Sequence, residues 1–283
     1  MRYEIRSMGL AEILDTGFRL LRNHFALLFG IGLAIYLPIG LLGGLLGTQI
    51  EELTAPGAGA GDEVDVALVG LAGLAAVVFY LVGFPFVSCA ITHALGRLYL
   101  GREARLGDSF AEALRRFLPL AGTYLVYGLI LVALYAALLV PGIVLGGAFL
   151  ALAIVVAVLA SLYLQLSFLL LVQVIVLEET AGVPALARSR ELMSGHLLRG
   201  LGLFLVVGLV AMVLGVGVTL VLAPVPVLEP FGTALYYAAI FAYTSAVSVV
   251  FYFDLRSRKE SFDLEHLARL VEERSEPRSR PPV

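Results

Sequence analysis

Residues 146–177 constrain this chain more than any other stretch, because they contain no charged residue, histidine, proline or asparagine. As one continuous helix they would be about 48 Å long, at about 1.5 Å per residue. The hydrocarbon core of a bilayer is about 30 Å thick, and about 20 apolar residues cross it as a helix. A helix that is apolar on every side has to be buried. The stretch therefore predicts an integral membrane protein.

The rest of the composition extends this prediction to several membrane spans. The chain is 60% hydrophobic and 14% charged, whereas ordinary soluble domains are about 25% charged. The hydrophobic excess lies in six long apolar segments. These segments are residues 25–47, 66–94, 119–140, 146–177, 200–222 and 231–253. We expect an all-α, polytopic membrane protein with six transmembrane helices in a single domain, residues 1–260.

Short amphipathic segments precede the first, third and fifth spans, at residues 8–24, 108–118 and 181–198. Apolar residues at helical spacing on one side and charged residues on the other are typical of helices in the membrane interface. For the first segment, a helix that packs against the soluble-facing part of the protein is the alternative. The arrangement predicts three hairpin repeats, each preceded by a cytoplasmic interfacial helix. Residues 261–283 are expected to form a further cytoplasmic amphipathic helix and a disordered tail.

Local signals mark where two of these elements begin and end. Ser109 and Glu112 have the spacing of a capping box at the start of the second amphipathic segment. Pro141 and Gly142 predict a tight turn between the third and fourth spans. The fourth span is longer than a bilayer requires, so we expect it to tilt or to project beyond the membrane.

The distribution of basic residues predicts the topology. All 19 lysine and arginine residues lie in the N-terminal segment, in the loops before the third and fifth spans, or in the C-terminal tail. The alternate loops contain none, and the loop at residues 48–65 is acidic. Basic loops stay in the cytoplasm. We therefore expect both termini and the amphipathic helices in the cytoplasm of a cell-membrane protein, with residues 48–65 outside.

The six spans contain no Asp, Glu, Lys or Arg. Ion-coupled carriers and pumps usually place ionisable groups at mid-membrane. The four histidines lie near or outside span ends without ligand spacing, and no nucleophile elbow or phosphate-binding loop is present. We therefore expect no catalytic residue, no metal, no cofactor and no nucleic-acid partner.

Three groups of polar residues remain as candidate sites. Arg115 and Arg116 are candidates for contact with anionic lipid headgroups, or they only enforce topology. Gln165 and Gln173 are eight residues apart, so they share a helix face, where they hydrogen-bond between helices or line a polar cavity. The last group is a cytoplasmic charge cluster, interpreted as structural rather than catalytic. Its members are Arg188, Arg190, Asp254, Arg256, Arg258 and Glu260.

The end of the sixth span, residues 250–265 (VFYFDLRSRKESFDLE), resembles the ending of a family of bacterial and archaeal six-span proteins. That family is described as the membrane domain of glycerophosphoryl diester phosphodiesterase. Residues 187–193 (ARSRELM) and 13–25 (ILDTGFRLLRNHF) are similar to two further family elements, while Ser261 stands where glycine is commoner. The resemblance implies the fold. It implies no hydrolase activity, because catalysis in the enzymes belongs to a separate soluble barrel, for which residues 254–283 are too few.

These observations leave two functional hypotheses from different classes. The first is a non-enzymatic scaffold or accessory subunit that associates with membrane lipids and with a membrane-protein partner. The alternative is a transporter or lipid-handling protein with a cavity between the three hairpins. Internal repeats favour the second hypothesis, whereas spans without ionisable groups count against coupled ion transport.

Overall fold

The computed structural model describes residues 6–54, 70, 73–74 and 79–260, which are helical with no strand among them. This confirms the all-α class. In chain order the elements are α1 (Leu10–Asn23), α2 (Phe25–Thr54), the π-helix η1 (Phe79–Gly83), α4 (Phe84–Tyr99), α5 (Leu106–Leu145), α6 (Gly147–Ser167), α7 (Leu171–Leu177), α8 (Val183–Met193), α9 (Leu197–Leu222), the 3₁₀ turn η2 (Pro226–Leu228) and α10 (Glu229–Glu260).

Helix α4 lies at the centre of the fold, in contact with α2, α5, α7 and α10. Its only charged residue is Arg97, in the last turn, so every other side is free to pack against apolar neighbours. Most of its residues are buried, and the ring of Tyr99 stacks on Phe253 of α10 with 4.9 Å between centroids. We call this region the hub, comprising Met8, α1, α4, α7, α8, residues 106–124 of α5, the first turn of α9 and residues 245–260 of α10.

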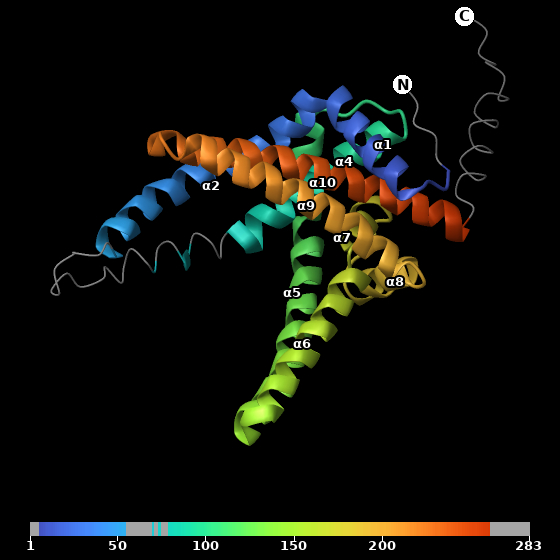
Figure 1. The fold of residues 1–283 in the computed structure, drawn as a ribbon. Helices are drawn as coiled ribbons and strands as arrows, with labels where there is room; N and C mark the ends of the chain where they lie inside the picture. Colours follow the sequence, from blue (N-terminus) through green and yellow to red (C-terminus); the bar gives the residue numbers. More distant parts are fainter. Residues whose placement is uncertain (1–5, 55–69, 71–72, 75–78, 261–283) are drawn as a thin grey trace, which may run out of the picture.

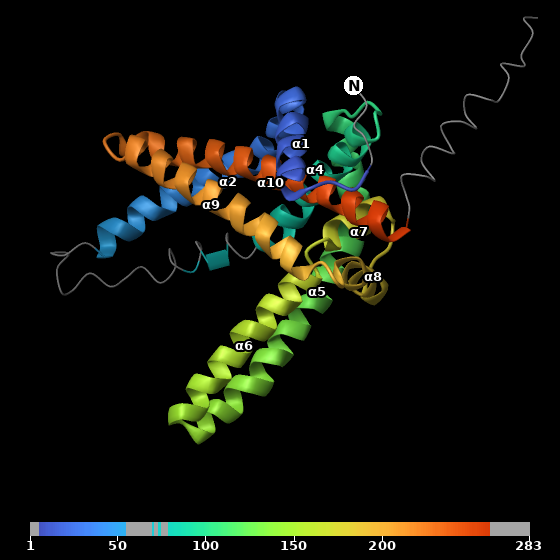
Figure 2. The same cartoon turned by 45° about the vertical axis from the view of Figure 1, so that its right-hand side comes forward.

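Two groups of helices leave the hub in different directions (Figures 1 and 2). Residues 125–162 of α5 and α6 lie side by side and project alone, and we call them the α5–α6 arm. Helices α2, α9 and α10 run together in the other direction as the α2–α9–α10 arm. The charged networks described below lie at the hub, and the ends of both arms point away from it.

The tip of the α5–α6 arm is a turn at Gly146, which has φ +65° and ψ −175°. That conformation is open almost only to glycine. Near the tip, a Cβ at Gly142 would lie 2.8 Å from the Cβ of Ala153, so the two helices approach closely there. The turn expected at Pro141 and Gly142 was therefore wrong, because both residues lie inside α5.

Helix α5 runs without interruption from Leu106 through Pro119. Residues 108–118 are thus its first turns, not a separate interfacial helix. The helix is preceded by Arg105, whose carbonyl accepts a hydrogen bond from Ser109 Oγ (3.0 Å). Ser109 is consequently one turn inside the helix, and the expected capping box with Glu112 was wrong. Only half of such a box occurs at α1, where the Gly9 N–H donates to Glu12 Oε2 (2.7 Å), because glycine has no side chain to cap the helix.

The uncharged stretch at residues 146–177 is not one straight helix. It is interrupted by turns at residues 168–170, between α6 and the short α7. The end of α6 is held by α8, because Ser189 Oγ donates to the Ser167 carbonyl (3.1 Å) in a buried position. The break lets α7 turn into the hub while α6 stays in the arm.

Several helices are long and apolar enough to cross a membrane, which makes this a multi-pass membrane protein. Four stretches qualify among the described residues, at Leu106–Leu145, Gly147–Leu177, Leu197–Leu222 and Glu229–Glu260. A fifth qualifies if α1 and the first part of α2, which meet at an 85° bend, count as one span. Six spans and a threefold hairpin repeat remain predictions. Much of the expected span 66–94 and all of residues 261–283 lie outside the described residues.

Helix α1, the first expected interfacial helix, packs on α10 through a glycine. A Cβ at Gly17 would lie 3.2 Å from the Val247 backbone, so the two helices meet almost backbone to backbone. Ile13 and Leu20 are buried on this side, while Phe18 stays 53% exposed, with its ring edge-on to Tyr243 of α10. The helix thus combines a packed face with an apolar residue left at the surface.

Candidate functional site: two ion-pair networks in the hub

The C-terminal turns of α10 carry two sets of polar residues on opposite faces. Tyr252, Arg256 and Glu260 repeat at intervals of four, so they form one row along the helix. Asp254 and Arg258 form a second row, displaced by two residues, or about 200° of rotation at 3.6 residues per turn. The residues expected as one charge cluster are therefore divided between two networks.

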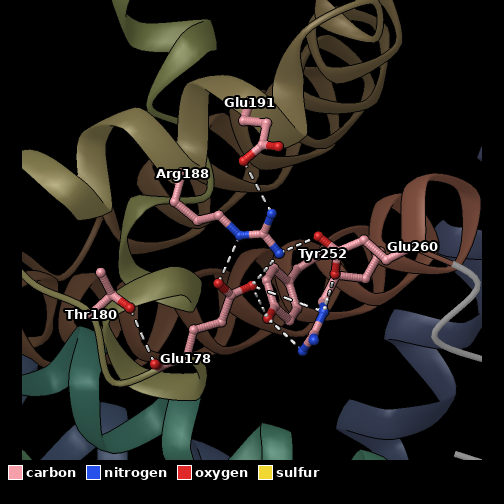
Figure 3. A network of polar contacts seen from close by, with 7 residues as sticks. Glu178, Thr180, Arg188, Glu191, Tyr252 and Glu260 are labelled. Atoms are coloured by element: carbon pink, nitrogen blue, oxygen red, sulfur yellow. Dashed lines mark hydrogen bonds and ion pairs between the residues drawn. The ribbon is translucent and has the colours of Figure 1, made fainter. Parts of the chain in front are cut away.

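The first network is centred on Arg188 of α8 and joins α7, α8 and α10 (Figure 3). Arg188 donates from Nε to Glu178 Oε2 (2.8 Å), from Nη1 to Glu191 Oε2 (3.2 Å) and from Nη2 to Glu260. Three carboxylates thus surround one half-buried guanidinium. We call this the Arg188 network, with members Glu178, Arg188, Glu191, Tyr252, Arg256 and Glu260.

The α10 row completes this network from the opposite side. Tyr252 donates its hydroxyl proton to Glu178 Oε1 (2.8 Å), and Arg256 donates to the Tyr252 hydroxyl (3.2 Å) and to Glu260 Oε2 (3.0 Å). Glu178 and Glu260 are each shared between donors on two helices. Such charge-assisted bonds are stronger than neutral ones, and they fix α8 relative to α10.

Electrostatics in the Arg188 network favour the charged forms. Burial alone would raise the pKa of Glu260, but hydrogen bonds from Arg188 and Arg256 outweigh burial and lower it. The hydrogen bond to Glu178 is the largest influence on Arg188, whose pKa rises above its ordinary value. Both shifts follow from pairing opposite charges in a partly desolvated place.

The second network surrounds Asp254, whose side chain is 0% exposed. Its carboxylate accepts hydrogen bonds from the Met8 N–H (2.6 Å) and from Arg258 Nε (3.1 Å), and it forms an ion pair with Arg199 at 3.0 Å. Arg199 and Arg258 also donate to the Met8 carbonyl, the latter at 2.8 Å. We call this the Asp254 network, with members Met8, Arg199, Asp254 and Arg258. It ties the chain before α1 to the start of α9 and the end of α10.

A third set of charges anchors the base of α5 to the end of α7. Arg116, 13% exposed, pairs with Glu112, with Glu179 Oε1 (2.6 Å) and with the Ile175 carbonyl (3.3 Å). Glu179 has φ +59°, a strained value for a residue other than glycine. This turn lets the adjacent Glu178 and Glu179 reach arginines on different helices.

The remaining candidates are placed separately. Arg115 is 75% exposed, with one long contact to Glu112 (3.8 Å), so it differs sharply from its neighbour Arg116. Arg190 is exposed on α8 and forms no ion pair with the described residues. Gln165 is exposed near the end of α6. Gln173 is buried in α7, and its Oε1 has no hydrogen-bond partner among the described residues. The break at residues 168–170 separates the two glutamines.

The networks also contain residues that were not among the sequence candidates, namely Glu178, Glu191, Arg199, Tyr252 and the Met8 backbone. Glu178 and Glu179 directly follow the long uncharged stretch, a position that marks the end of the span. Met8 and Asp254 are 246 residues apart in the chain, so no local pattern relates them. No cluster of three or more His, Cys, Asp or Glu side chains suited to a metal ion occurs within the described part of the chain. What the networks can do is cross-link helices.

Comparison of the chain with family models, with curated proteins and with solved structures finds no match.

Proposed function

We propose that this chain is a non-enzymatic membrane scaffold or accessory subunit whose α5–α6 arm docks against a membrane-protein partner. The observation that carries the proposal is the contrast in burial between helices. In α10, 56% of the most apolar 18-residue window is buried inside the chain, but in α5 only 6% is, the same share as in α9 of the other arm. Helix α6, with the α7 segment, reaches 11%. The arm therefore offers two faces of apolar side chains that its own chain does not cover.

A membrane setting explains why such an arm is tolerated, because lipid tails are as apolar as leucine. Association between helices in lipid depends on close packing rather than on burial from water. The arm's outer surface includes Gly128, whose Cβ position faces open space. Small residues of this kind let a partner helix approach closely. This supports a packing role.

The base of the arm is fixed, which supports docking over an arm that merely moves in lipid. Thr123 accepts a hydrogen bond from the Gly182 N–H (2.7 Å), and Arg116 pairs with Glu179. These contacts tie α5 to the segment that carries the Arg188 network. A partner seated on the arm would thereby be held in a set direction relative to the hub.

We also propose six spans with both termini in the cytoplasm of a cell-membrane protein. The basic loops support this orientation through the positive-inside rule. The gathering of Arg116, Arg188 and Arg256 at the hub, away from the arm tip at Gly146, is compatible with it. Under this proposal the hub lies at the cytoplasmic interface, and Arg115 is the exposed cation available to anionic headgroups.

Membership of the phosphodiesterase membrane-domain family is likewise a proposal. The residues that carry the resemblance include Arg188, Asp254 and Arg256, all of which pair with charged residues outside their own helix. Those contacts give the motif a structural purpose that requires no hydrolysis. The resemblance therefore supports the scaffold proposal without adding an enzyme activity.

The test is purification of the tagged chain in native membrane discs, followed by mass spectrometry. We expect one stoichiometric membrane protein, and we expect Gly128→Trp to reduce its recovery. Gly208→Trp is the matched control, because Gly208 also faces open space but lies on α9. Recovery of no partner, together with enrichment of one lipid class, would overturn the proposal in favour of lipid handling.

A further inference from the structure

The α2–α9–α10 arm contains an open groove of about 690 Å³ that the networks do not explain. This volume falls within the range of small-molecule sites, about 300–1,000 Å³. The groove lies between α9 and α10 and is closed on one side by α2. Its walls are Phe29, Val213, Leu214, Gly217, Val218, Val221, Leu222, Gly232, Leu235, Tyr236 and Ala239.

Small residues occur at helical spacing along the two helices that line this groove. The α9 wall repeats at intervals of about four, and Gly217 lies in the middle of that stripe. The facing stripe of α10 has Gly232 at one end and Ala239 at the other. A Cβ at Gly217 would meet no atom within 4 Å. The missing side chain at Gly217 leaves space open, whereas at Gly232 the Leu222 side chain takes up the place that a Cβ would occupy.

The wall formed by Tyr236 is fixed in place. Its hydroxyl donates to the Ala211 carbonyl (2.7 Å), and a Cβ at Gly215 would lie 3.0 Å from the hydroxyl oxygen. The one polar side chain of the lining thus has its hydrogen bond satisfied by α9, outside the groove. Phe29 is steadied by its stack on Phe25, with 4.8 Å between centroids. The groove is therefore largely preformed.

We propose that this groove binds one acyl chain of a membrane lipid. Both α9 and α10 qualify as membrane spans, so hydrocarbon surrounds the mouth, where Val213, Leu214 and Val221 are exposed. The lining suits an uncharged hydrocarbon chain, since it has no charged group and no free hydrogen-bonding side chain. A headgroup or a polar ligand would leave its own polar groups unpaired there.

The size of the groove also favours a single chain over a protein helix. A helix with its side chains is about 10–12 Å across and would have to displace the exposed valines at the mouth. The site lies within one arm, so it differs from the cavity between three hairpins that a repeat would create. A preformed site lowers the ordering cost of a flexible chain.

The chain contains no tryptophan, which allows a test with single-tryptophan variants. Phe29→Trp places the probe in the groove, and Leu220→Trp places it on α9 outside the lining, where Leu220 is 69% exposed. Each variant is titrated in detergent micelles with dibrominated phosphatidylcholine, whose acyl bromines quench tryptophan. We expect half-quenching of the groove probe at an about fivefold lower lipid fraction than for the control, equivalent to about 1 kcal/mol.

Filling the groove provides the second half of the test. Adding Gly217→Leu to Phe29→Trp should move its quenching curve onto that of the control, whereas Gly208→Leu should leave it unchanged. Both glycines lie on α9 with open space at the Cβ, and only Gly217 lines the groove. Without any tryptophan, native mass spectrometry should find one fewer retained lipid in Gly217→Leu than in Gly208→Leu.

Coincident quenching curves for Phe29→Trp and Leu220→Trp would overturn the proposal. So would a groove probe that stays unquenched in a protein that is dimeric by mass, because a second copy would then cover the groove. Equal lipid counts in the two leucine variants would also contradict it. None of these outcomes depends on the partner of the α5–α6 arm.

Discussion

The hub and the α5–α6 arm are made of equally helical chain, yet they are stabilised differently. In the hub, α4 is packed on almost every side and two ion-pair networks join segments far apart in sequence. In the arm, two apolar helices touch mainly each other, and Ser161 Oγ donates to the Tyr135 hydroxyl (2.8 Å) to link them. The hub is held together by contacts within the chain, while the outer faces of the arm are largely exposed.

Helices α10 and α5 differ both in hydrophobicity and in how much of each is buried. Helix α10 is less hydrophobic than α5, with a mean hydropathy of 1.6 against 2.6 in the most apolar window, yet it is far more buried. The most apolar helices are therefore the least buried within the chain, and the helix of mixed composition is the most buried. Small residues on α10, such as Ala246 and Ser248, are buried and let neighbouring helices approach closely, while the Ser248 hydroxyl donates to the Thr244 carbonyl of its own helix (2.8 Å).

The largest expected effect comes from removing the buried carboxylate of the hub. Asp254→Ala leaves Arg199 and Arg258 without their shared partner and frees the Met8 N–H. We expect a loss of about 3 kcal/mol in the free energy of unfolding, as for other broken buried pairs. Thermal unfolding in detergent, followed by circular dichroism, measures it.

Asp15→Ala is the matched control for that variant, because Asp15 pairs with Arg19 at the surface with both side chains more than half exposed. Exposed pairs contribute about 0–1 kcal/mol. If both variants lose the same stability, the Asp254 network is not what distinguishes the hub.

A pair of glycine substitutions tests packing in the two regions directly. Gly17→Leu in the hub forces α1 away from Val247, and overpacking of this kind costs about 1–3 kcal/mol. Gly128→Leu in the arm meets no atom and should be neutral or slightly stabilising, since leucine favours helices. Unfolding midpoints in detergent report both, and a destabilised Gly128→Leu would show that the arm is packed internally.

Replacing Arg188 by lysine should have a smaller effect than the loss of Asp254. Lysine keeps the charge but cannot donate in a planar fork to Glu178, Glu191 and Glu260 together. We expect a loss of about 1–2 kcal/mol, in line with charged hydrogen bonds. The exposed Arg190→Lys is the control in the same helix, and an equal loss there would argue against the Arg188 network.

The smallest expected effect is a loss of stability of the hub at low pH. Glu112 and Glu260 have pKa values lowered below 4.5, because arginine hydrogen bonds outweigh the effect of burial. Their contribution to stability is therefore complete above pH 4.5 and is lost as the pH falls through the lowered pKa values. Glu260→Gln should flatten this decline in unfolding curves recorded between pH 6 and pH 3, and an unchanged slope would contradict the assignment.

Much of this organisation was predictable from the sequence, because composition and charge act over whole segments. The uncharged stretch at residues 146–177 indicates a membrane protein, and the helical class follows from the need to pair every backbone group in lipid. The break at residues 168–170 was not predictable, because Phe168, Leu169 and Leu170 give no proline or glycine signal. It depends on tertiary contacts such as Ser189 with the Ser167 carbonyl.

The candidate site was predictable only in part. Arg188, Arg256 and Glu260 lie together, and the spacing of α10 already places Asp254 on another face. No local pattern predicts Arg199 or the Met8 backbone, since their partner Asp254 is 55 residues from Arg199 (254 − 199) and 246 residues from Met8. Arg115 and Arg116 are adjacent and identical, yet only the fold determines which one is buried.

The most direct test of the account is photo-crosslinking in the native membrane. A crosslinking amino acid is placed at successive positions of α6 from Phe149 to Tyr163, and the adducts are identified by mass spectrometry. The account predicts adducts with one protein at outward positions such as Leu152, Val155 and Leu159, repeating at helical spacing, and none at the buried Ala157. Lipid adducts alone at every outward position would contradict the claim that the arm is a docking element.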